Sequence, residues 1–318
     1  MSDPFETFAD VEELAERLIN PDPVVRRLAV KDLGETALAE AEPLILGAIG
    51  DPNAEVRQQA AQALAEFDGL EVAEGLARLL RDPDSGVAQG AAESLAALKS
   101  PKAGGPLLLL VEDAAPFVRA AALRALKALR LPAALPLAVA GLQDSWPAVR
   151  AQAVGVIGYL KRDETLPALI GAVRDANAEV RAAAVGALAF SRLAAAADAA
   201  ALALQDSDWQ VRNAAAETLG RIGRGSATPA LIAALDDEFW QVRQKAAQSL
   251  GKLKARDAVP KLLSALTHEK PNLRKEAAAA LGEIADARAR ASLEAAGNDP
   301  DPDVRKTVLW ALGRLTNS

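Results

Sequence analysis

The sequence predicts an all-α fold, a right-handed α-solenoid of ten helical hairpins, and two observations carry this prediction. Of the 318 residues, 51% are hydrophobic but only 3% are aromatic, so Ala and Leu supply much of the apolar content. These strong helix formers favour closely packed helices, whereas strands draw on β-branched and aromatic residues. The dipeptide Val-Arg also recurs at a spacing of 31 residues, as in Val25-Arg26 and Val56-Arg57, and a fixed period of this length is typical of repeat proteins.

The repeat is expected to fill the chain as a single array over residues 9–318, after a short tail at 1–8. Counting back from each Val-Arg pair places the unit boundaries without any insertion. We expect the units 9–39, 40–70, 71–101, 102–132, 133–163, 164–194, 195–225, 226–256, 257–287 and 288–318. Each hairpin has an apolar face that it cannot bury alone, so neighbouring units must stack.

The second helix of each unit follows from residues at fixed distances after the Arg. A small residue such as Ala29 stands three positions after it and a large aliphatic residue such as Leu33 seven after it, which places both on one face of a helix. Gly or Ala stands eight after it in every unit except the fourth, which has Lys127, so neighbouring helices can approach closely.

Helix starts are also visible in the sequence. Prolines in one column, such as Pro43 and Pro167, suit the first turn of the first helix. An Asp or Asn before the second helix predicts its N-cap. These predicted caps are Asp22, Asn53, Asp84, Asn177, Asp208 and Asp301.

The pattern D-x-[DN]-x-x-VR-x-x-A-x-x-x-L-G, as in residues 206–220, resembles the short HEAT-like repeat of the phycobilisome-lyase type. The resemblance implies that the second helices line the concave side of the array. It also implies a structural ladder between repeats, built from the Arg column and from an Asp column six residues before it. The Arg residues are Arg26, Arg57, Arg119, Arg150, Arg181, Arg212, Arg243, Arg274 and Arg305, and the Asp residues are Asp51, Asp82, Asp113, Asp144, Asp175, Asp206, Asp237 and Asp299.

Two positions depart from the ladder. Ala88 stands in the Arg column of the third unit, which also carries Gly86 and Gly90 near the start of its second helix. Because Gly in a helix costs about 1 kcal/mol relative to Ala, we hypothesise a soft joint there. His268 stands in the Asp column, and its neighbour Glu269 makes the only His-Glu pair of the chain.

Composition excludes several functions. With no Cys and one His, the chain has neither a thiolate nucleophile nor the ligands of a zinc or multi-histidine site, and we expect no metal and no cofactor. A net charge of −7 argues against nucleic-acid binding. Neither a secretory h-region nor a membrane-spanning apolar run is visible, so we expect a cytoplasmic protein. Ser and Thr lack a nearby His as a base, so we expect no catalytic residues.

Large aromatic residues are the candidate partner-binding residues, because the Ala and Leu columns already fill the core. Seven lie in the fourth to eighth units: Phe117, Trp146, Tyr159, Phe190, Trp209, Phe239 and Trp240. Trp146 and Phe239 take the N-cap position itself, where Asp or Asn would gain about 0.5–2 kcal/mol. A residue that gives up a capping hydrogen bond without a local gain in stability points to function. The alternative is that the turn aromatics cover the seams between repeats.

Tyr159 and Phe190 share one column of consecutive units and are expected to be neighbours. In the same two units, Gly155 and Gly186 replace polar residues of an exposed column, which lowers the surface beside the two rings. Such a shallow apolar patch would suit a protein partner. The alternative is that the rings of Tyr159 and Phe190 fold over their own helices.

The function predicted from these observations is non-catalytic binding of another protein, by a monomer or by a chain that self-associates weakly through its end repeats. Trp310, on the last helix, marks one such end. The resemblance also implies an alternative, a bilin lyase or a bilin-handling chaperone. A toxin-neutralising immunity protein is a further alternative, since residues 1–74 carry a net charge of −12 that could steer a basic partner.

Overall fold

The computed structural model describes residues 11–316, and the predicted tail at 1–8 lies outside them. The described chain is all helical and is an α-solenoid, which confirms the predicted fold class. It falls into two compact units, Met1–Leu160 and Lys161–Ser318, and each is described by itself. The boundary lies close to the predicted end of the fifth repeat at 163. That all ten repeats form one continuous array stays a prediction.

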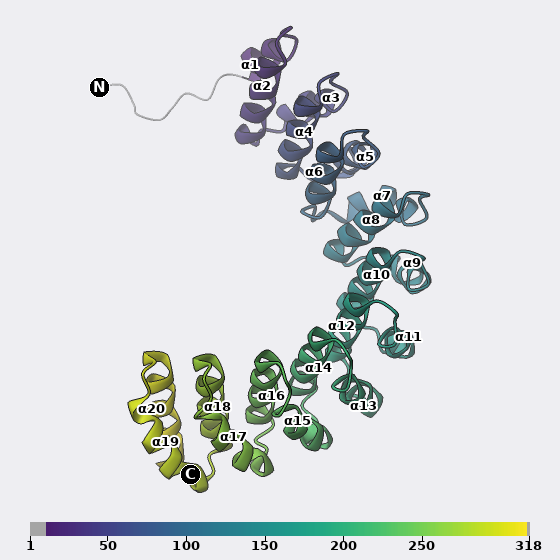
Figure 1. Ribbon diagram of the computed structural model, residues 1–318. Coiled ribbons are helices and arrows are strands. Elements are labelled where there is room, and N and C mark those ends of the chain that lie inside the picture. Colours follow the sequence, from purple (N-terminus) through teal and green to yellow (C-terminus); the bar gives the residue numbers. More distant parts are fainter. Residues whose placement is uncertain (1–10, 317–318) are drawn as a thin grey trace, which may run out of the picture. The chain divides into compact units, whose positions relative to one another are not determined.

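Each unit contains five hairpins in its described part, and in every hairpin an odd-numbered helix is followed by an even-numbered one (Figure 1). In the first unit the odd-numbered helices are α1 (Val11–Arg17), α3 (Ala41–Ala48), α5 (Leu70–Leu79), α7 (Gly104–Leu110) and α9 (Ala134–Gly141). The even-numbered helices are α2 (Pro23–Thr36), α4 (Ala54–Ala63), α6 (Ser85–Leu95), α8 (Pro116–Leu129) and α10 (Pro147–Leu160).

The second unit repeats this order. Its odd-numbered helices are α11 (Leu166–Ala172), α13 (Ala194–Ala203), α15 (Thr228–Ala234), α17 (Val259–Ala265) and α19 (Arg290–Ala295). Its even-numbered helices are α12 (Ala178–Ala187), α14 (Trp209–Ile222), α16 (Trp240–Lys252), α18 (Pro271–Ile284) and α20 (Pro302–Thr316). Short 3-10 helices complete the connections: η1 (Leu64–Glu66), η2 (Pro101–Ala103), η3 (Asp163–Thr165), η4 (Leu188–Phe190), η5 (Gly225–Ala227), η6 (Arg256–Ala258), η7 (Ala287–Ala289) and η8 (Ala296–Asn298).

Helix ends follow the predicted capping residues. Asp22 and Asn53 have extended backbones, and their side chains accept hydrogen bonds from N–H groups of the first turns of α2 and α4. The other four predicted caps accept the same bonds, so all six predictions are confirmed. The column prolines, such as Pro43 and Pro167, lie in the first turns of odd-numbered helices, where a missing N–H costs no hydrogen bond.

The core of each unit lies between its two layers of helices. The Ala column of the even-numbered helices is fully buried from Ala29 to Val308, and the Leu column is fully buried from Leu33 to Leu281. Consecutive even-numbered helices of one unit pack side by side, as α16 and α18 do. The small residue eight after the Arg allows this approach. A Cβ on Gly34 would lie 2.8 Å from the Cβ of Ala63.

The joint between α6 and α8 differs from its neighbours. These two helices pack less extensively than the other consecutive even-numbered pairs of the first unit, whereas α5 and α7 pack more closely than α3 and α5. Ala88 supplies no Arg at this joint. Asp113 instead accepts a hydrogen bond from Arg81, which precedes α6 in the turn after α5. The weaker packing supports the hypothesis of a soft joint, which stays a prediction.

We expect Gly251→Ala to destabilise the second unit and Gly186→Ala to leave it intact. The added Cβ of Gly251 would lie 2.8 Å from the Cα of Ala280, so the backbones of α16 and α18 must separate, at a cost of about 1–3 kcal/mol. Around Gly186 nothing lies within 4 Å, and Ala should raise the free energy of unfolding by about 0.5–1 kcal/mol. Each Gly is the next-to-last residue of its helix. Urea unfolding of the two variants measures both changes, and equal effects would contradict the close-approach role of the Gly column.

Candidate functional site

The Arg column reaches from each repeat into the next. Arg26 donates from Nε to Oδ2 of Asp51 over 2.7 Å and from Nη2 to Oδ1 over 2.8 Å, which is a bidentate fork between repeats. The same fork joins Arg57 to Asp82, Arg119 to Asp144, Arg181 to Asp206, Arg212 to Asp237, and Arg274 to Asp299. These side chains are largely buried, so solvent screens the pairs less than it screens surface pairs.

Each fork also organises the loop before its own helix. Nη1 of Arg26 donates to the carbonyl oxygens of Asn20 and Pro21 over 2.8 and 3.1 Å, and Oδ1 of Asp51 accepts the N–H of Asn53 over 2.8 Å. One Arg and one Asp therefore hold two turns and the interface between two repeats. Arg150 and Arg305 make the same carbonyl contacts in their own repeats, and Asp175 accepts the N–H of Asn177.

The forks keep the Asp column ionised. Hydrogen bonds from the Arg side chains hold the pKa values of Asp51, Asp82, Asp144, Asp206 and Asp299 below the ordinary value of 3.8. A carboxylate whose pKa is lowered by folding stabilises the fold above its unfolded pKa, and this contribution disappears as the pH falls through the lower, folded value. Each complete Arg–Asp fork forms one rung of the ladder. The stability that these rungs contribute is thus insensitive to pH near neutrality.

The rung between α16 and α18 is incomplete because His268 replaces the Asp. Its Nδ1 accepts the N–H of Lys270 over 3.0 Å, as an Asp Oδ1 would, and its Nε2 lies 2.9 Å from Nη2 of Arg243. A neutral imidazole has only one acceptor nitrogen. In one of these two contacts, therefore, an N–H group of the imidazole faces the N–H group of its neighbour. Nε of Arg243 is buried and has no hydrogen-bond partner among the residues that the structure describes.

Burial lowers the pKa of His268 first, and the neighbouring Arg243 lowers it further, against an opposing effect of Glu269. The charges of Lys270 and Arg274 act in the same direction as that of Arg243. The neutral imidazole is therefore the form that the folded chain favours. Protonation would place a second positive charge beside Arg243.

The candidate aromatic residues divide by exposure between the two units. In the first unit Phe117, Trp146 and Tyr159 are 41, 55 and 45% exposed. In the second unit the four others, Phe190, Trp209, Phe239 and Trp240, are half-buried. Tyr159 and Phe190 belong to different units, so their predicted adjacency stays a prediction. Only the first three rings therefore present a large apolar surface to a partner.

Phe117 and Tyr159 lie on the exposed faces of two consecutive even-numbered helices of the first unit. Phe117 is in the first turn of α8, and Tyr159 is in the last turn of α10. The guanidinium of Arg130 lies 4.8 Å from the centre of the Tyr159 ring, and its Nη2 donates to the phenol oxygen over 3.1 Å. Trp146 directly precedes α10, and its N–H donates to Oδ1 of the rung residue Asp144 over 2.9 Å.

Trp209 and Phe239 cover a rung of the ladder. Their rings stack with centres 5.4 Å apart, and the guanidinium of Arg212 lies 5.6 Å from the centre of the Phe239 ring. Arg212 is the most buried Arg of the described forks. This arrangement is the alternative left open from the sequence, in which turn aromatics cover a seam between repeats. Phe239 occupies the N-cap of α16 without a side-chain capping bond, as expected.

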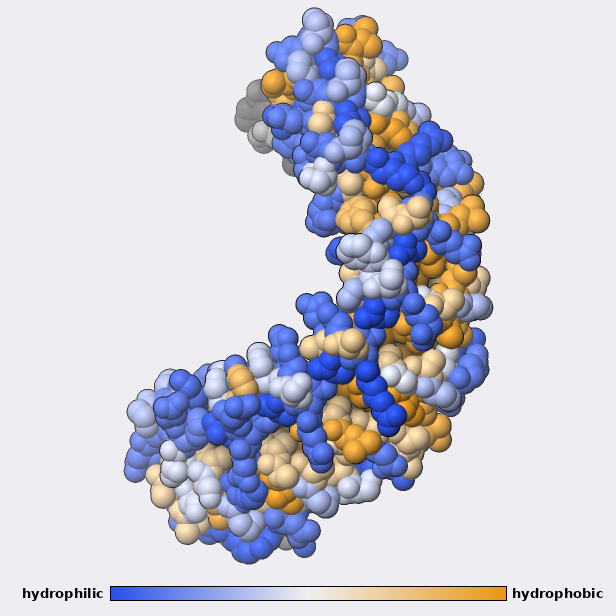
Figure 2. Space-filling view, turned by 45° about the vertical axis from the view of Figure 1, so that its right-hand side comes forward, coloured by the Kyte–Doolittle hydropathy of each residue, from blue (hydrophilic) through white to orange (hydrophobic). Residues whose placement is uncertain are grey.

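Exposed apolar surfaces that the sequence patterns did not reveal lie on the odd-numbered helices of each unit. Helices α7, α9, α11 and α15 contain no charged residue, and α13 contains only Asp198. Figure 2, which brings the odd-numbered helices forward, shows hydrophobic residues on this side, and Leu109 and Leu202 are 80 and 62% exposed. The missing charges are a signal in the sequence that could have identified this face.

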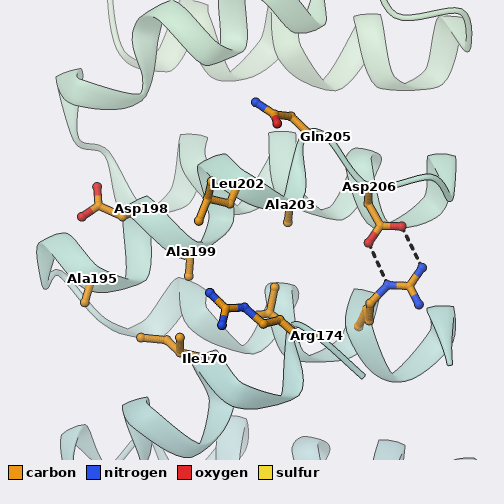
Figure 3. A pocket seen from close by; sticks show the side chains of 11 residues that line it. Ile170, Arg174, Ala195, Asp198, Ala199, Leu202, Ala203, Gln205 and Asp206 are labelled. Carbon is orange, nitrogen blue, oxygen red and sulfur yellow. Dashed lines mark hydrogen bonds and ion pairs between the residues drawn. The ribbon is translucent and has the colours of Figure 1, made fainter. Parts of the chain in front are cut away.

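A groove of about 500 Å³ opens on this face between α11 and α13 (Figure 3). Ile170 and Val173 line it from one repeat, and Ala195, Ala199 and Leu202 from the next. The fork between Arg181 and Asp206 closes one end. Its shape combines apolar walls with charged groups at the edges, which is typical of a site for an amphipathic ligand.

Comparison with known families decides the identity of the repeat. A model described as HEAT repeats matches residues 11–96, 72–148, 135–220 and 228–313, which together cover most of the chain. The chain belongs to the HEAT-repeat family. A model described as PBS lyase HEAT-like repeat also matches, over residues 211–237, in agreement with the resemblance of residues 206–220. No curated protein matched the chain.

Solved structures show the same fold at low identity. An engineered protein is 22% identical with a TM-score of 0.50, covering 97% of this chain and 99% of that one. Kap95p, in a structure concerned with RanGDP, is 18% identical with a TM-score of 0.65, covering 98% of this chain and 50% of its own. Importin beta is 18% identical with a TM-score of 0.61, covering 97% and 50%. This HEAT-repeat chain thus spans about half the length of the two karyopherins.

The HEAT-repeat solenoid is a fold typical of protein-interaction scaffolds, and it is generally non-enzymatic. No helix within residues 11–316 is long and apolar enough to cross a membrane. Within the same residues, no group of three or more His, Asp or Glu side chains is placed to hold a metal ion.

We expect His268→Asp to complete the rung and to remove a pH dependence. Since the folded chain lowers the pKa of its single His, the wild type loses stability as the pH falls through the ordinary value of 6.5 toward the lower, folded value. An Asp can accept both donors of Arg243 and stays ionised in this range. The variant should gain about 1 kcal/mol at neutral pH and change little down to about pH 5.

Urea unfolding between pH 7 and pH 5 measures both effects. His268→Asn is the matched control, because it can accept the N–H of Lys270 but supplies no charge to Arg243. We expect it to remove the pH dependence without the gain in stability. A wild type whose stability is constant over this range would contradict the role of His268.

Proposed function

We propose that this protein is a non-catalytic scaffold that binds another protein on the exposed face of its even-numbered helices. The seven aromatic residues of the central repeats are the proposed partner-binding residues. The observation that carries the proposal is the exposure of Phe117, Trp146 and Tyr159 in the first unit. Exposed aromatic side chains on a rigid support are the groups that most often dominate the binding energy of protein interfaces.

Local energetics support the same surface. Trp146 stands directly before α10 at a position that in six other repeats carries an Asp or Asn cap, and it remains more than half exposed. An Asp there would contribute about 0.5–2 kcal/mol, so the Trp is retained at a cost to the helix. Tyr159 already has Arg130 over its ring, which offers a partner both an apolar ring and a charge. A partner with an aromatic or acidic group would complement both.

The half-buried aromatics of the second unit have a smaller part in the proposal. Trp209 and Phe239 contribute their outer ring faces, while their inner faces cover the Arg212 rung. Phe190 and Trp240 contribute the exposed parts of their side chains. We therefore expect substitutions in the second unit to affect stability together with binding, and substitutions in the first unit to affect binding alone.

Affinity capture from the native host tests the proposal when it is run with variants. We expect Phe117→Ala and Tyr159→Ala each to weaken binding of the captured protein by about 2 kcal/mol, since each removes an exposed aromatic anchor. Tyr159→Phe is the matched control, because it keeps the ring under Arg130 and removes only the phenol oxygen. Isothermal titration with the purified partner gives the affinities, and unfolding curves show that the variants are folded.

A captured partner that binds both Ala variants as tightly as the wild type would contradict the proposal. The alternatives inferred from the sequence have their own readouts. A change in the absorption spectrum of phycocyanobilin on mixing would favour a bilin-handling function. A basic toxin whose binding is lost on neutralising the acidic residues of positions 11–74 would favour an immunity protein.

A further inference from the structure

No long side chain spans the groove between α11 and α13. The equivalent position between α15 and α17, two repeats further on, is occupied by Lys261, whose Nζ donates to the carbonyl oxygen of Ile232 over 3.3 Å and to Asp236. Lys261 thus extends across from one odd-numbered helix to the other. The residue at the same repeat position on α13 is Ala199, whose methyl group cannot span this distance.

The groove also lacks the carboxylate that the equivalent place between α15 and α17 has. Arg174 occupies the repeat position of Asp236, so a cation stands where the pair between α15 and α17 has its carboxylate. Figure 3 shows the side chain of Arg174 extending into the groove beside Ala199. Among the residues that the structure describes, no acceptor lies within hydrogen-bond distance of its guanidinium. The α11–α13 groove therefore combines an apolar opening with a cation that makes no ion pair within residues 11–316.

Apolar side chains line the groove beside the exposed Arg174. Ile170 and Val173 line one side of the groove and Leu202 the other, with Ala199 and Ala203 between them. Leu202 is 62% exposed, on the same side of α13 as the exposed residues Ala195 and Asp198 that also line the groove. Asp198 stands at the edge, and in Figure 3 its carboxylate points away from Leu202. The charge directed into the groove is positive.

We propose that the α11–α13 groove is a second docking site, which binds a protein segment that presents a large apolar side chain next to a carboxylate. The apolar side chain fills the space between Ile170 and Leu202, and the carboxylate pairs with Arg174. A basic residue further along the segment can pair with Asp198, which gives the bound segment a direction. This inference rests on the proposed function of protein binding but uses the opposite layer of helices.

Three short helical peptides test the chemistry of the site. They share one stripe of leucines at helical spacing and differ only in the residues beside it, which are Glu, Gln or Lys. Methyl NMR of the full chain follows Ile170, Val173 and Leu202 during each titration. We expect the Glu peptide to shift these methyl signals and to bind at least about tenfold more tightly than the Lys peptide.

Variants of the chain locate the binding. Ala199→Glu places a carboxylate at the position of Lys261, where it fills the groove and pairs with Arg174, so we expect loss of peptide binding with unchanged or higher thermal stability. Ala230→Glu is the matched control, since it alters the same repeat position on α15 outside the groove, and it should bind normally. Arg174→Glu should reverse the preference, so that the Lys peptide binds more tightly than the Glu peptide.

Several outcomes would overturn the proposal. Equal binding of the Glu and Lys peptides, retained binding by Ala199→Glu, or signal shifts confined to other helices would each do so. Concentration-dependent self-association that Ala199→Glu abolishes would instead assign the groove to a second copy of this chain. Tyr159→Ala in the same titrations separates the two sites, because it weakens the partner of the even-numbered face and leaves the groove peptides unaffected.

Discussion

The bidentate Arg–Asp fork between consecutive repeats is the interaction on which the rest of the structure depends. Each fork makes two charge-assisted hydrogen bonds to the next repeat and two more to its own loop, and the Asp also holds the turn that leads to the following N-cap. Because one pair of side chains sets the turn and the interface together, neighbouring hairpins stack in one register. The Ala, Leu and Gly columns then bury their apolar groups in that register.

Departures from the fork show what each of its parts contributes. Where Ala88 replaces the Arg, Asp113 takes a hydrogen bond from Arg81 in the preceding turn, and the even-numbered helices pack less extensively. His268 keeps the turn-forming hydrogen bond. It contacts Nη2 of Arg243, but Nε of Arg243 has no hydrogen-bond partner among the described residues. The turn and the inter-repeat bond are therefore separable functions of the Asp position. Trp209 and Phe239 show a third arrangement, in which stacked rings lie beside the Arg212 rung.

The repeat also makes functional candidates visible by comparison within one chain. Positions that the stack requires are occupied in nearly every unit, so a departure that the stack does not use stands out. Tyr159 and Trp146 are departures of this kind on the even-numbered helices. On the odd-numbered helices the departures are Lys261 and Asp236, whose pair spans α15 and α17, whereas Ala199 and Arg174 at the same repeat positions leave the α11–α13 groove open. The two proposed docking surfaces thus lie on opposite layers of the fold.

The sequence alone determined the helical hairpins, their caps and their core columns, because each depends on residues close in the chain and recurs at a fixed period. It could not decide which aromatic rings are exposed, since exposure depends on neighbours one repeat away: Phe239 lies against Arg212 and the Trp209 ring, whereas Trp146 is 55% exposed. The sequence alone could not predict the α11–α13 groove either. A groove arises from side chains on two helices about 30 residues apart, and only tertiary packing brings Ile170 and Leu202 to its two sides.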